Sequence, residues 1–168
     1  MQRRRLLKLG AGAAALLALA GGGVALVQPG LLGGRLTAAG RDVFEAVARA
    51  VLHGTLPSTQ PEAKTALTAH MGRLDDVLRA FPPHVQAELS QLLSLLSTTP
   101  GRRLLAGLSA DWPDASVEAL QASLDDMRRS GIAVRQQAYH ALRDITNAAF
   151  YSDASAWPKL GYPGPRAL

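Results

Sequence analysis

The stretch 37-TAAGRDVFEAVARAVLHG-54 decides the predicted fold class. Its apolar residues recur at every third or fourth position: Val43, Phe44, Val47, Ala48, Val51 and Leu52. This spacing places the six side chains on one broad face of an α-helix, whereas a half-buried strand would alternate apolar and polar residues. Thr37 is a suitable N-cap, and the segment 53-HGTLP-57 ends the predicted helix.

The same helical spacing recurs along the rest of the chain, between prolines and small polar residues. We predict further helices from about Pro61 to Arg79, over 84-HVQAELSQLLSLLS-97, from Thr99-Pro100 through Leu108, from Asp114 onward, and from about Gly131 to Tyr151. Their expected inward-facing residues are Leu67, Met71, Leu74 and Leu78; Val85, Leu89, Leu92, Leu93 and Leu96; Val117, Leu120, Leu124 and Met127; and Ala138, Leu142, Ile145 and Ala149.

These patterns predict an all-α fold, a compact bundle of about five to six short helices with an irregular C-terminal tail. No alternating strand pattern of useful length is present. We divide the chain into an N-terminal signal or anchor helix with its linker (1–34), a helical domain (35–151) and an extended tail (152–168).

The charge of the chain is concentrated at its start. The formal net charge is +5, but Arg3, Arg4, Arg5 and Lys8 supply four of the eighteen basic residues, which leaves fourteen against thirteen acidic ones. A body so close to neutral lacks the basic surface that nucleic-acid binding requires. The chain has no cysteine, which excludes disulfides, thiolate metal ligands, a cysteine nucleophile and haem attached through Cys-x-x-Cys-His.

An apolar segment follows the basic start. Residues 9–27 are uncharged, and as a helix they would be about 28 Å long, enough to span a bilayer core. Five glycines and many alanines make this segment only mildly hydrophobic, which favours an export signal over a permanent anchor. Ala18-Leu19-Ala20 and Gly23-Val24-Ala25 are candidate cleavage sites, and without cleavage the chain would stay tethered to the membrane.

The basic start itself, 3-RRRLLK-8, resembles the twin-arginine translocation motif. Arg3 and Arg4 match the arginine pair, and Leu6, Leu7 and Lys8 match the positions that follow it. The twin-arginine translocase moves folded proteins and reads the motif as an address, so the resemblance implies export to the periplasm with membrane contact through the N-terminal segment.

The histidines do not form a recognisable metal or catalytic site. His53, His70, His84 and His140 are far apart in the sequence, and no two have the i, i+4 spacing of a helical metal site. We expect a structural or surface role for each. The chain also contains no nucleotide-binding or Gly-x-Ser-x-Gly motif, so we assign no catalytic, cofactor-binding or metal-binding residue.

Two pairs of adjacent aspartates indicate that the helix faces carrying them are exposed to solvent. Side chains of neighbouring helical residues diverge by about 100°, so Asp75 with Asp76, or Asp125 with Asp126, cannot readily share a proton or a metal. We expect Asp75 to pair with Arg79 four residues later, and Asp125 to pair with the residue at the same spacing, Arg129.

The tail, 150-FYSDASAWPKLGYPGPRAL-168, departs from the helical pattern. It holds four of the eight aromatic residues and three of the ten prolines of the chain. Proline and glycine at this density predict that no helix forms, whereas the aromatic residues are unusual for a solvated linker. The tail either packs on its own bundle or lies on another protein, and the two are compatible.

Both ends of the chain together resemble the gluconate 2-dehydrogenase subunit 3 family. The matching residues are Arg3 and Arg4 at the start, and Tyr151, Trp157, Gly161, Tyr162, Pro163, Gly164 and Pro165 in the tail. The resemblance implies a non-catalytic small subunit that accompanies a large flavin dehydrogenase of the glucose-methanol-choline type, often with a cytochrome c subunit. The flavin then belongs to the partner, and the tail residues form the expected partner interface.

The resemblance therefore implies that this chain carries the export address for a catalytic subunit that lacks one, and supports its maturation and stability. The alternative is a stand-alone exported helical protein that binds a small ligand, and an enzyme in its own right ranks third. The substrate of the partner enzyme would not touch this chain.

Overall fold

The computed structural model describes residues 28–164. This part of the chain is all-α, as predicted, with six α-helices. These are α2 (Ala38–Val51), α3 (Gln60–Arg79), α4 (Pro83–Ser97), α5 (Thr99–Gly101), α6 (Val117–Arg129) and α7 (Ala133–Tyr151). A π-helical turn η2 (Arg102–Ala106), a 3₁₀-helix η3 (Ala154–Leu160) and a hairpin of strands β1 (Leu31–Leu32) and β2 (Arg35–Leu36) complete the structure.

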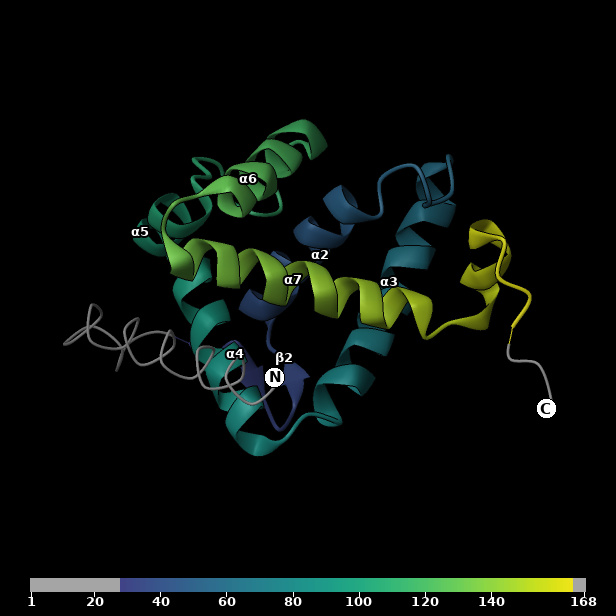
Figure 1. Ribbon diagram of the computed structural model, residues 1–168, viewed down its shortest axis with the longest axis horizontal. Coiled ribbons are helices and arrows are strands. Elements are labelled where there is room, and N and C mark those ends of the chain that lie inside the picture. Colours follow the sequence, from purple (N-terminus) through teal and green to yellow (C-terminus); the bar gives the residue numbers. More distant parts are fainter. Residues whose placement is uncertain (1–27, 165–168) are drawn as a thin grey trace.

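Helix α2 lies at the centre of the bundle. It contacts α3, α4, α6 and α7, and Figure 1 shows α7 crossing in front of it. Val43, Phe44 and Val47 are completely buried, which confirms the apolar face predicted from the opening stretch. Three further buried residues on this helix are alanines, Ala46, Ala48 and Ala50. Small side chains allow the neighbouring helices to approach α2 on several sides.

The apolar faces predicted for the other long helices are also confirmed. Their buried residues are Leu67, Met71, Leu74 and Leu78 on α3; Leu89, Leu93 and Leu96 on α4; Leu120, Leu124 and Met127 on α6; and Ala138, Leu142 and Ala149 on α7. Val85, Leu92, Val117 and Ile145 are half-buried at the edges of these faces.

Two predicted helix starts are wrong by one to three residues. The N-cap of α6 is Ser116, whose hydroxyl accepts from the backbone N–H of Ala119, because Asp114 belongs to a preceding turn. The N-cap of α5 is Thr98 rather than Thr99, since its hydroxyl accepts from the N–H of Gly101. Both true caps are hydroxyl residues that satisfy an otherwise unpaired donor of the first turn.

The loop before α6 contributes a core residue that helical spacing could not predict. Trp112 is 3% exposed, and its Nε1 donates to the carbonyl of Leu96 at 2.8 Å. The guanidinium of Arg49, on α2, donates to the loop carbonyls of Trp112, Pro113 and Ala115. These bonds satisfy backbone acceptors that a loop packed on the core would otherwise leave unpaired.

The β-hairpin extends the packed body beyond the predicted domain start at residue 35. Gly33 and Gly34 form its turn with φ of 58° and 73°, a conformation that favours glycine. The N–H groups of Gly30 and Leu31 donate to the hydroxyls of Ser94 and Ser90 on α4. Gly30 and Leu31 are buried, so residues assigned to the linker belong to the folded body.

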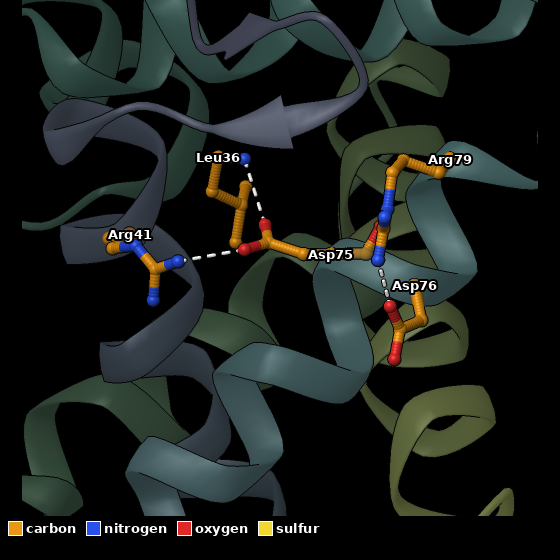
Figure 2. Close-up of polar contacts among 5 residues, drawn as sticks. All are labelled: Leu36, Arg41, Asp75, Asp76 and Arg79. Atoms are coloured by element: carbon orange, nitrogen blue, oxygen red, sulfur yellow. Dashed lines mark hydrogen bonds and ion pairs between the residues drawn. The ribbon is translucent and has the colours of Figure 1, made fainter.

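Asp75 joins this hairpin to the helices, contrary to the predicted solvated pair with Arg79. Its carboxylate accepts from the backbone N–H of Leu36 at 2.9 Å and from Arg41 of α2 at 2.8 Å (Figure 2). Arg79 instead pairs with the exposed carboxylate of Asp76. The prediction was wrong because Asp75 lies on the inner face of α3, where two neighbouring elements supply its partners, β2 through Leu36 and α2 through Arg41.

On α6 the predicted pairing is confirmed. Arg129 lies 2.5 Å from the carboxylate of Asp125, and Arg128 lies 2.7 Å from it. Asp126 pairs separately with Arg135 of α7. The two pairs at Asp125 are exposed, and exposed pairs contribute little to stability.

We expect Asp75→Ala to lower the free energy of unfolding by about 2–4 kcal/mol, because the buried N–H of Leu36 and the guanidinium of Arg41 both lose their acceptor. Asp75→Asn keeps a neutral acceptor and should be milder. Urea unfolding of these variants beside Asp76→Ala measures the difference, since loss of the exposed Asp76 pair should change stability by no more than about 0.5 kcal/mol. Equal effects at the two positions would contradict this assignment.

Candidate functional site

The tail continues from α7 as the 3₁₀-helix η3, which contradicts the prediction that proline and glycine exclude a helix there. The carboxylate of Asp153 caps η3 by accepting from the N–H of Ser155. Pro158 is tolerated because a single short 3₁₀ segment requires few backbone donors. Gly161, with φ of 68°, ends the segment in the left-handed conformation. Figure 1 shows η3 in yellow beyond the end of α7.

Trp157 contacts several other residues of the tail. Its indole Nε1 donates to the carbonyl of Tyr151 at 2.9 Å, and its ring meets the ring of Tyr162 edge-on at a centroid distance of 5.4 Å. Gly164 is buried against the same ring, where a Cβ would lie 3.4 Å from the indole. Trp157 is half-buried, so much of its surface is used in contacts within this chain.

Other residues of the predicted interface remain exposed. Tyr151 and Tyr162 are 43% and 48% exposed, and Gly161 and Pro163 are exposed beside them. The structure therefore divides the predicted interface into internal and exposed residues. We call Tyr151 and Tyr162, with Pro163, the tail surface. The remaining sequence-predicted site residues, Pro165 and Arg3, Arg4, Leu6, Leu7 and Lys8, lie outside the described residues.

Polar contacts with α3 hold the tail on the bundle. Arg73 forms an ion pair with Asp153 at 3.0 Å, and its Nε donates to the carbonyl of Ala149 at 3.2 Å. The hydrogen bond from the backbone of Ser155, with the nearby charge of Arg73, lowers the pKa of the Asp153 carboxyl below its ordinary value. The carboxylate thus stays ionised in mildly acidic solution. Ala156 of η3 is buried, so the tail holds a fixed position on the bundle.

A cavity of about 260 Å³ lies between the tail, the α2–α3 connection and α3. His70 lines it, and this side chain is 1% exposed. Among the described residues, neither ring nitrogen has a hydrogen-bond partner. Burial, and to a lesser extent the charge of Arg73, lowers the pKa of His70 to about 4. The imidazole is therefore uncharged at neutral pH.

Sequence reasoning gave His70 no individual role. Its position did carry a signal, because it lies three residues after Leu67 and four before Leu74, on the apolar face of α3. Burial of the ring could be expected from that spacing. The cavity beside it could not, because residues from the α2–α3 connection, α7 and η3 form the rest of the lining.

No helix within residues 28–164 is both apolar and long enough to cross a membrane. Over the same range, the side chains of His, Asp and Glu form no group of three or more that could hold a metal ion. Comparison of the chain with models of protein families, with curated proteins and with solved structures finds no match.

Proposed function

We propose that this chain is the non-catalytic small subunit of a periplasmic or membrane-associated flavin dehydrogenase of the glucose-methanol-choline type. It carries the twin-arginine address for the catalytic subunit and supports the maturation and stability of that subunit. The observation that supports this function best is the tail surface, where two tyrosines are exposed on a segment that the rest of the tail holds in place.

The tail surface has the properties of a binding anchor. Tyrosine provides a large, rigid contact area, and aromatic residues are enriched among those that dominate binding energy at interfaces. The ion pair of Arg73 with Asp153 and the hydrogen bond from Trp157 to Tyr151 position the rings before binding. Less conformational entropy is then lost when a partner covers them.

The roles of the two subunits in this proposal are those that the family resemblance implies. The motif at Arg3 and Arg4 directs export of folded proteins, and a flavoprotein that loads its cofactor in the cytoplasm must cross the membrane folded. In this proposal the flavin resides on the large subunit, and the resemblance implies that a cytochrome c subunit often accompanies the two. This chain contributes no catalytic group and binds the large subunit through its tail surface.

The test is co-expression with the large subunit, followed by affinity measurement and a melting curve of the free small subunit. Tyr162→Ala should weaken binding by about 2 kcal/mol, roughly thirtyfold, with a small change in melting temperature because the ring is exposed. Trp157→Ala should weaken binding and also lower the melting temperature, since the indole is packed within the tail.

Ile132→Ala is the matched control, because Ile132 is 58% exposed and lies before α7, at the end opposite the tail. It should leave both measurements unchanged. Undiminished binding by Tyr162→Ala and Tyr151→Ala would show that the tail surface is not the interface.

A further inference from the structure

The cavity beside His70 has a mixed lining, whose apolar part is contributed by segments far apart in the sequence. Leu52 and Leu56 come from the end of α2 and the connection that follows it, Ala66 from α3, Phe150 from α7 and Ala156 from η3. An engineered apolar cavity of about 150 Å³ is known to bind benzene. The volume of about 260 Å³ found here therefore accommodates a ring or short chain with a few further atoms.

Thr55, Arg73, Asp153 and Ser155 also line the cavity, but within the described residues the buried polar atoms of the lining that lack a hydrogen-bond partner are the two ring nitrogens of His70. As a neutral imidazole, His70 offers one N–H donor and one nitrogen acceptor, and neither has a partner among the described residues. An unpaired polar group in a protein interior is unfavourable, and a ligand that forms the missing hydrogen bond removes that penalty. The ring therefore favours a ligand that carries a hydroxyl or carbonyl group.

The two charged residues that line the cavity have opposite charges and form an ion pair. Arg73 and Asp153 both line it, and they form an ion pair with each other at 3.0 Å. Arg73 also donates to the carbonyl of Ala149, and Asp153 accepts from the N–H of Ser155. Because the guanidinium and carboxylate already satisfy one another, the cavity favours a neutral ligand over an ion.

We infer that this cavity is a binding site for a small neutral amphipathic molecule, of about ten non-hydrogen atoms, whose hydroxyl or carbonyl group hydrogen-bonds to His70. The apolar body of the ligand packs between the leucines of the α2–α3 connection and Phe150. The site belongs to this chain alone and is independent of the proposed partner, so it can be tested on the isolated protein.

The test uses two probes that differ in the hydrogen-bonding group, 4-fluorophenol and 4-fluorotoluene. Each is titrated by fluorine NMR into the full chain and into His70→Leu, which replaces the imidazole with an apolar side chain of similar volume. Both probes should bind both proteins saturably. The ratio of the two dissociation constants should change by about three- to tenfold between the proteins, because only the wild type can form the hydrogen bond.

Ala66→Phe places a ring in the cavity and should abolish binding of both probes. Ala122→Phe, on the exposed face of α6, is the matched control and should leave binding intact. If His70→Leu does not fold, the ring signals of His70 in the wild type decide, since they should shift with 4-fluorophenol and stay nearly unchanged with 4-fluorotoluene. Absence of saturable binding, binding that survives Ala66→Phe, or an unchanged ratio of the constants would overturn the inference.

Discussion

Phe44→Ala is expected to lower the free energy of unfolding by about 3–5 kcal/mol, a large part of the roughly 5–15 kcal/mol that stabilises a typical domain. Phe44 is completely buried on α2, which four other helices contact. Removal of the ring forfeits its transfer free energy and leaves a cavity that these helices cannot fully close. Urea unfolding followed by circular dichroism measures the effect as a lower midpoint at an unchanged slope.

Leu104→Ala is the control for this prediction. Leu104 lies on η2 with 75% of its surface exposed, so its truncation removes apolar atoms that are already in contact with water. Its effect should remain within about 0.5 kcal/mol. A Phe44→Ala protein that unfolds at the wild-type midpoint would mean that α2 is not the centre of the core.

Replacement of Arg3 and Arg4 together by lysine is expected to strand the protein in the cytoplasm. The translocase receptor recognises a pair of planar guanidinium groups, which the compact ammonium of lysine does not reproduce. Both positions must change, because Arg4 and Arg5 form a second adjacent pair that can serve in place of the first. Fractionation of cells that express the full chain measures the distribution between cytoplasm and periplasm.

Arg5→Lys is the matched control, since it keeps the pair of Arg3 and Arg4 and the same net charge. Export of this variant should be normal. If the double variant accumulates in the periplasm, in cells where the same change blocks a known twin-arginine substrate, the export assignment is wrong. The catalytic subunit of the proposed complex should follow the same distribution, so its location in the double variant also tests the proposed escort function.

Helical spacing predicted the buried faces well because burial of such a face depends on residues that are close together in the sequence. Val43, Phe44 and Val47 are close neighbours in sequence, and their burial follows from the 3.6-residue period whatever packs against them. The pair of Asp125 and Arg129 was predictable for the same reason. Each of these features depends on residues within one or two turns of a single helix.

Features that depend on distant partners could not be predicted in this way. The i, i+4 spacing predicted an ion pair of Asp75 with Arg79. Asp75 instead pairs with Arg41, 34 positions away in the sequence, because Arg41 faces the inner side of α3. The cavity at His70 likewise requires residues from four segments of the chain. The tail contains features of both kinds. Its turns depend on neighbouring residues, whereas the ion pair that holds it on the bundle joins Arg73 to Asp153, 80 positions later.

The central position of α2 also determines when the protein can finish folding. This helix ends at Val51, whereas α7, which covers it, ends at Tyr151, about 100 residues later. At a synthesis rate of about 5–20 residues per second, the ribosome needs about 5–20 s to produce the missing cover. During that interval the apolar face of α2 lacks its final neighbour and is a ready target for a chaperone. Completion of the core is therefore a late event, reached when the last long helix leaves the ribosome.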